Sequence, residues 1–122
     1  MKIRIKGNSI RLRLSRPEVE YFGQENYLED AVNFGNSKLV YALSGRGQGS
    51  VITAEFENNK ITVHIPSTLA AAWTKTEKVG YDAEHSLSDG RRLYILVEKD
   101  FKCLDNTVED QSANYPNPLA ER

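Results

Sequence analysis

The sequence predicts an α+β fold in which two ββαββ halves form a closed or nearly closed eight-stranded antiparallel barrel with two short helices. Three observations support this prediction: an apolar pattern that occurs twice, alternating segments that end at turn residues, and two short segments with helix-start residues. The chain has 122 residues, which is the length of one ordinary domain.

The apolar pattern recurs at an offset of 51 positions, so residues 2–22 align with residues 53–73. Seven apolar positions coincide: Ile3/Ala54, Ile5/Phe56, Ile10/Ile61, Leu12/Val63, Leu14/Ile65, Val19/Ala70 and Phe22/Trp73. Because a repeated pattern implies a repeated structure, we expect one duplicated domain over residues 1–104. Its pseudo-repeats would be residues 2–44 and 51–98, followed by a polar tail over residues 105–122.

The first half alternates apolar and polar residues between turn residues, which is typical of strands. Strands are expected at Lys2–Lys6, Ile10–Leu14, Tyr27–Phe34 and Lys38–Leu43. Ser15 and Glu18 have the spacing of a capping box, and Gly23 can end the short helix that they begin.

The second half follows the same plan, with a helix that begins at Ser67 or Thr68 and extends through Trp73. Strands are expected at Val51–Glu57, Ile61–Ile65, Val79–Glu84 and Leu93–Val97. Asp89-Gly90 is a strong hairpin-turn pair. The glycine-rich segment Gly45–Gly49 is expected to be a mobile loop between the halves, since no helix follows it as a dinucleotide site would require.

Composition predicts a soluble cytoplasmic protein that binds neither membranes nor nucleic acid. The single cysteine, Cys103, excludes an internal disulfide and suits a reducing compartment. No apolar stretch approaches the length of a membrane span. The formal net charge of −1 gives no reason to expect a nucleic-acid partner.

The basic residues of the first two predicted strands are the best candidate for a binding site. Lys2 accompanies the four that we expect to contact a ligand: Arg4, Lys6, Arg11 and Arg13. Because side chains alternate along a strand, these cations share one face. Inside a barrel they would bind phosphate or carboxylate groups.

Two other interpretations of the same residues stay open. The cations could form a solvated outer face that protects an edge strand from aggregation. They could also be neutralised internally, by Glu55, Glu57 and Glu98 or by the acidic residues of the tail. In the second half, Thr62 and His64 replace Arg11 and Arg13, so that half has lost the cations.

Other reactive residue types give no site. His64, His85, Cys103 and Asp105 match no zinc-binding spacing, and His64 is expected to be a partly exposed strand residue. Cys103 is expected to be a small residue on a short final strand. We therefore predict no catalytic residue, no metal and no cofactor.

The order of elements over residues 2–98 resembles the triphosphate tunnel, or CYTH-like, fold. Members of that superfamily carry Glu-x-Glu-x-Lys on the strand before the first helix. Here the two equivalent strands are Ile10-Arg11-Leu12-Arg13-Leu14 and Ile61-Thr62-Val63-His64-Ile65, so the resemblance does not imply hydrolase activity. The segments 97–106, 110–112 and 115–118 also resemble a family of short uncharacterised bacterial proteins.

The function that we predict is non-catalytic binding of an anionic small molecule or an acidic peptide by the cationic hairpin. The first alternative is a divergent phosphohydrolase that binds a divalent metal through Glu55, Glu57 and Glu98. The second is a structural or protein-interaction module, such as a homodimer formed through an uncovered edge strand.

Overall fold

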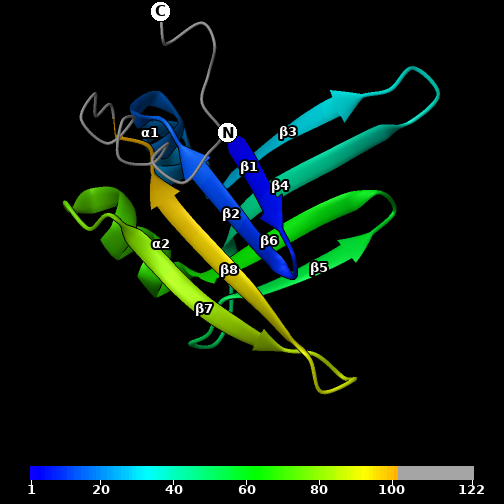
Figure 1. The fold of residues 1–122 in the computed structure, drawn as a ribbon. Helices are drawn as coiled ribbons and strands as arrows, with labels where there is room; N and C mark the ends of the chain where they lie inside the picture. Colours follow the sequence, from blue (N-terminus) through cyan, green and yellow to red (C-terminus); the bar gives the residue numbers. More distant parts are fainter. Residues whose placement is uncertain (102–122) are drawn as a thin grey trace, which may run out of the picture.

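The computed structural model describes residues 1–101, which form two four-stranded sheets and two helices (Figure 1). Sheet A contains, in spatial order, β1 (Lys2–Lys6), β2 (Ser9–Leu14), β8 (Arg92–Lys99) and β7 (Gly80–Ser86). Sheet B contains β3 (Tyr27–Asn33), β4 (Lys38–Gly47), β6 (Lys60–Pro66) and β5 (Thr53–Glu57). The helices are α1 (Arg16–Glu25) and α2 (Ser67–Lys75).

The prediction of an eight-stranded antiparallel barrel is wrong. The strands form two separate sheets, and each sheet is mixed because β2 runs parallel to β8 and β4 runs parallel to β6. Turn residues in the sequence define each hairpin, but they carry no information on how one hairpin pairs with another. That pairing depends on contacts between residues far apart in the chain.

Closure would require backbone ladders between β1 and β3 and between β5 and β7. Within residues 1–101, neither pair of edges forms a ladder, and each is instead linked by a hydrogen bond that involves a side chain. The Met1 amino group lies 3.1 Å from Asp30 Oδ2, and the Ala54 backbone N–H donates to His85 Nδ1 at 3.3 Å. The sheets therefore approach each other at these contacts without becoming one continuous sheet.

Each sheet combines one hairpin from each half of the chain. The first hairpin of the N-terminal half, β1–β2, pairs with the last hairpin of the chain, β7–β8. In the same way, β5–β6 pairs with β3–β4. Strands at corresponding places in the halves thus occupy corresponding places in the two sheets, with β1 and β5 at edges and β2 and β6 beside a parallel partner.

Both helices lie at the same end of the molecule, where the chain crosses from one sheet to the other (Figure 1). Helix α1 begins with the predicted capping box, in which the Ser15 N–H donates to Glu18 Oε1 at 2.8 Å. Helix α2 begins at Ser67, and the residue at its N-cap is Pro66, which makes no side-chain cap hydrogen bond. The helices meet through the rings of Phe22 and Trp73, whose centroids are 5.9 Å apart in an edge-to-face arrangement.

The core lies between the sheets and under the helices. Its largest fully buried side chains include Trp73, Phe22, Leu12, Leu14, Leu43, Ile65 and Ile95. The repeated apolar pattern therefore marks the core, except at its pair nearest the hairpin turns. Ile5 and Phe56 are 58% and 64% exposed, and they lie near the turns of the β1–β2 and β5–β6 hairpins. These turns are at the end of the sheets away from the helices (Figure 1).

Gly45 belongs to a strand rather than to the predicted mobile loop, since β4 continues to Gly47. A Cβ atom at Gly45 would lie 2.9 Å from Cζ of Phe22 and 3.3 Å from Cβ of Ala70. The first glycine of the segment thus allows both helices to pack against β4. The sequence pattern alone could not separate this packing role from loop flexibility.

Candidate functional site

The five basic residues of the first hairpin lie on the outer face of sheet A. They are Lys2, Arg4, Lys6, Arg11 and Arg13. In the β1–β2 register, Arg4 faces Arg11, while Ile3 faces Leu12 on the other side of the sheet. Leu12 is fully buried in the core, so the cations point away from it. They do not line the interior that a barrel would have provided.

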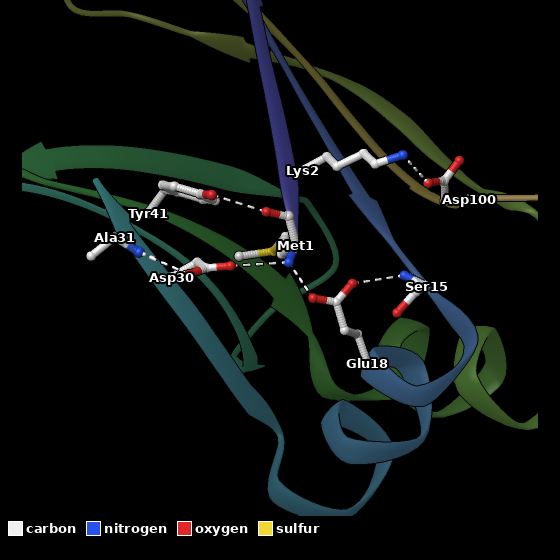
Figure 2. A network of polar contacts seen from close by, with 8 residues as sticks. All are labelled: Met1, Lys2, Ser15, Glu18, Asp30, Ala31, Tyr41 and Asp100. Carbon is white, nitrogen blue, oxygen red and sulfur yellow. Dashed lines mark hydrogen bonds and ion pairs between the residues drawn. The ribbon is translucent and has the colours of Figure 1, made fainter. Parts of the chain in front are cut away.

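Two carboxylates from the C-terminal end of sheet A neutralise part of this charge. The Nε atoms of Arg11 and Arg13 lie 2.6 Å and 3.1 Å from Glu98 Oε1. Parallel pairing of β2 with β8 places Glu98 beside Arg13. Lys2 Nζ donates to Asp100 Oδ2 at 2.7 Å (Figure 2), and this hydrogen bond lowers the pKa of Asp100 despite some opposing burial. The predicted internal neutralisation thus occurs in part, through Glu98 but through neither Glu55 nor Glu57.

Arg4 and Lys6 have no carboxylate partner within residues 1–101. Arg4 instead borders a shallow hollow of about 300 Å³, whose other walls are Lys2, Ile3, Arg11 and Arg13. The Nε atom of Arg11 is buried there. Its 2.6 Å approach to Glu98 is an ion pair without hydrogen-bond geometry, so this nitrogen has no hydrogen-bond acceptor in the described part of the chain.

The corresponding outer face of sheet B lacks this charge. Thr62 and His64 occupy the positions of Arg11 and Arg13, and Ser44 lies beside His64 where Glu98 lies beside Arg13. His64 Nε2 instead contacts Glu55 Oε1 at 2.7 Å on the antiparallel side. His64 is partly exposed, as expected.

A second polar cluster, which the sequence analysis missed, joins the two sheets at the amino group of Met1 (Figure 2). This group donates to Glu18 of α1 and to Asp30 of β3, while the Tyr41 hydroxyl donates to the Met1 carbonyl at 3.0 Å. Glu18 also accepts the hydrogen bond of the capping box. No sequence pattern indicated this cluster, because it joins the residue before β1 to three separate elements, α1, β3 and β4.

The same cluster shifts the pKa values of its members. Burial by itself would lower the pKa of the Met1 amino group, but hydrogen bonds and charges of Glu18 and Asp30 outweigh it and raise that pKa. Burial would raise the pKa of Glu18, but its hydrogen bonds from Met1 and Ser15 lower it. Burial, followed by the nearby carboxylates, raises the pKa of Tyr41. The cluster therefore favours the charged forms of the Met1 amino group and Glu18 and the neutral form of Tyr41, and it ties the residue before β1 to α1, β3 and β4.

The other residues considered from the sequence do not come together. Glu55 and Glu57 lie on β5 of sheet B, whereas Glu98 lies on β8 of sheet A, so they form no shared metal site. Within residues 1–101, no group of three or more His, Cys, Asp or Glu side chains has the geometry to hold a metal ion. Cys103, Asp105 and the predicted tail lie outside the described residues.

The sequence of almost the entire chain matches one family model, over residues 1–119. The chain belongs to DUF7009, a family of unknown function. No curated protein and no solved structure matches it. Within the described part of the chain, neither helix has the length and apolar character needed to cross a membrane.

Proposed function

We propose that this protein binds a small phosphate- or carboxylate-bearing molecule on the outer face of sheet A, without catalysing a reaction. The binding residues would be Arg4 and Lys6, supported by Arg11 and Arg13. The observation that carries the proposal is the hollow beside Arg4, which Lys2, Arg11 and Arg13 also line, so that four basic side chains meet two carboxylates, Glu98 and Asp100, within residues 1–101. Lys6 does not line the hollow but follows Arg4 on the same face of β1.

The two pairs of cations have different parts in this proposal. Arg11 and Arg13 are held by Glu98, so they supply a positioned but partly compensated charge. Arg4 and Lys6 have no such partner in residues 1–101 and can turn toward an anion. An arginine binds a phosphate or carboxylate through two parallel hydrogen bonds, and the Arg4 guanidinium is the group best placed to do so.

Repulsion supports the same conclusion. Arg4 and Arg11 lie directly opposite each other across the β1–β2 pair, an arrangement that destabilises a sheet when both residues carry the same charge. An anion bound between them would remove this repulsion. Because Arg4 and Lys6 are exposed, the affinity should fall as the salt concentration rises.

Thermal unfolding in the presence of tripolyphosphate or citrate, each with and without Mg²⁺, tests the proposal. A ligand at about 100 times its Kd stabilises the folded state by about 2.7 kcal/mol, so we expect a clear rise in Tm without Mg²⁺. The double variant Arg4→Gln/Lys6→Gln should lose most of that rise. Stabilisation only in the presence of Mg²⁺ would favour the phosphohydrolase alternative instead.

The matched control is Lys38→Gln/Lys75→Gln, which removes the same charge from sheet B and from α2. It should retain the rise in Tm. An equal loss in both double variants would mean that general charge, not the hairpin, causes the effect. No rise with any anion would contradict the proposal outright.

A further inference from the structure

The outer face of sheet A carries opposite charges on its two halves. Its strands lie in the order β1, β2, β8 and β7 (Figure 1). The β1–β2 half holds the five basic residues described above. On β7, Tyr81 and Ala83 pack against the core. The alternating residues Asp82 and Glu84 therefore point outward. The same alternation on β8 places three residues on the outer face: Tyr94, Leu96 and Glu98.

The strand registers arrange these residues in three rows across the sheet. The row nearest the hairpin turns is Lys6, Ser9, Tyr94 and Glu84. The middle row is Arg4, Arg11, Leu96 and Asp82. The row nearest the helices is Lys2, Arg13, Glu98 and Gly80. The first two rows thus begin with a cation on β1 and end with a carboxylate on β7.

This arrangement makes the face complementary to itself. A twofold axis parallel to the strands, midway between β2 and β8, would place β1 of one copy over β7 of a second copy, and β2 over β8. Arg4 would then lie over the partner's Asp82. In the neighbouring row, Lys6 would lie over the partner's Glu84. Each contact would occur twice, because both copies use the same surface.

Arg4 and Asp82 are the residues that gain most from this contact. Both are exposed, and neither has an ion-pair partner within residues 1–101. Glu84, in contrast, already accepts a hydrogen bond from Arg92 Nη1 at 3.0 Å. Among the described residues, an unpaired cation and an unpaired carboxylate therefore lie at opposite ends of one row.

The centre of the face adds apolar contact to this charge pattern. Tyr94 is 45% exposed, and Leu96, the next outward residue on β8, is half-buried. Tyrosine is enriched in interfaces because its ring supplies contact area and its hydroxyl group finds a polar partner. Tyr94 would lie over the partner's Ser9, whose small side chain leaves room for the ring. The formal net charge of −1 means that two copies repel each other little at long range.

We infer that two copies of this chain associate through the outer faces of sheet A, with Arg4 of each copy paired with the partner's Asp82. The inference goes beyond the proposed function but shares Arg4 with it, so a bound anion and a second copy would compete for this residue. The four-stranded face covers about 400 Å² per copy, about half of the area of a standard stable interface. The dimer should therefore be weak, and its affinity should fall as the salt concentration rises.

Sedimentation velocity of the full chain at low salt, at concentrations from about 10 μM to 1 mM, tests the inference with two charge reversals. Arg4→Asp and Asp82→Arg each place like charges opposite each other in a homodimer. Each variant alone should therefore weaken dimerisation by about tenfold or more. An equimolar mixture of the two variants should dimerise again, because both contacts of the mixed dimer join opposite charges.

The matched control is Lys38→Asp, which reverses an exposed charge at the start of β4 in sheet B. It should dimerise like the wild type. All three substituted side chains are exposed, so none of these variants should prevent folding. A wild-type chain that stays monomeric at every concentration would overturn the inference. A dimer that the mixture of variants does not restore would place the interface elsewhere and would also overturn it.

Thermal unfolding separates this inference from the proposed function. Asp82→Arg should be monomeric and yet keep the rise in Tm with tripolyphosphate, because Asp82 does not line the hollow. A rise in Tm in a wild-type chain that never dimerises would overturn the dimer and leave the anion site standing. A dimer that the charge reversals control, without a rise in Tm for any anion, would support the dimer and contradict only the proposed function.

Discussion

The outer faces of the two sheets differ, although the strands beneath them are arranged in the same way. Sheet A carries Arg11 and Arg13 beside Glu98, and sheet B carries Thr62 and His64 at the corresponding positions, beside Ser44. The cations and their carboxylate thus occur together on one sheet and are absent together from the other. This teaches that Glu98 belongs with the two arginines as a structural unit, whereas Arg4 and Lys6 have no carboxylate partner within residues 1–101.

The core-facing residues of the two halves, in contrast, should contribute equally to stability. Substitutions of Phe22 and Trp73 test this, and they have the largest expected effect. Both side chains are fully buried and contact each other. Phe22→Ala and Trp73→Ala should each lower the free energy of unfolding by about 3–5 kcal/mol, measured by urea denaturation. A cost below about 1 kcal/mol for either one would show that the halves do not share the packing equally.

Removing the carboxylate from sheet A should have the next largest effect. Glu98→Gln leaves Arg11 and Arg13 side by side without neutralisation, and we expect a loss of about 1–2 kcal/mol in the free energy of unfolding. Ser44→Ala at the corresponding position should cost less than about 1 kcal/mol, and it serves as the control.

The sharpest test transfers the residues of sheet B onto sheet A. The triple variant Arg11→Thr/Arg13→His/Glu98→Ser should come within about 1 kcal/mol of the wild-type stability, because it removes both charges and their partner together. If the triple variant is no more stable than Glu98→Gln, then Arg11, Arg13 and Glu98 do not act as a structural unit.

The contact of the Met1 amino group at the β1–β3 edge belongs to a charged cluster, which should make the free energy of unfolding depend on pH. In this cluster, the lowered pKa of Glu18 in α1 means that its contact with the Met1 amino group stabilises the fold above the ordinary value of 4.5 and is lost as pH falls through the lowered pKa. The raised pKa of the Met1 amino group means that its contribution is complete below 8.0 and is lost as pH rises through the raised pKa. Stability should therefore be greatest between these limits.

Urea denaturation across that pH range, on the wild type and on Glu18→Gln, measures this effect. The substitution should lower stability near neutral pH by about 1–2 kcal/mol and should flatten the decline on the acid side. Glu20→Gln on the exposed side of the same helix should leave the profile unchanged. An unaltered acid decline in Glu18→Gln would assign the pH dependence to other groups.

The smallest effect is expected at the exposed ion pair between Lys2 and Asp100. The Lys2 side chain is 75% exposed, so Lys2→Gln should cost less than about 1 kcal/mol and the cost should shrink in high salt. A comparison of thermal unfolding at low and high ionic strength measures this. A larger, salt-independent loss would mean that Lys2 has a role in the hollow beyond this pair.

Local sequence patterns predicted the elements of this fold because their causes are local. Alternation placed β1 and β2, and the Ser15–Glu18 spacing placed the start of α1. The hairpin turn at Asp89-Gly90 also formed, with Gly90 at a positive φ of 87° and its N–H donating to the Leu87 carbonyl at 3.1 Å. Leu12 and Leu14 are in the core because every second residue of a strand lies on the same face.

The candidate site was only partly predictable, because its remaining features depend on pairing between distant strands. Alternation placed the cations on one face, but only the parallel register of β2 and β8 shows that Glu98 neutralises two of them. The Met1 cluster likewise brings together residues from several elements. The closed barrel failed for the same reason, since turn residues do not encode how hairpins assemble.

The pairing of the first hairpin with the last strand has a consequence for synthesis on the ribosome. Sheet B has all its strands once residue 66 has left the exit tunnel, whereas β2 of sheet A must wait for β8, which ends at Lys99. Until then, β2 is paired only with β1, and its other edge, which later pairs with β8, has no strand beside it. The β1–β2 hairpin is thus synthesised before sheet B but gains its pairing strand β8 only after it, and an unpaired strand edge of this kind is prone to aggregation while the chain is incomplete.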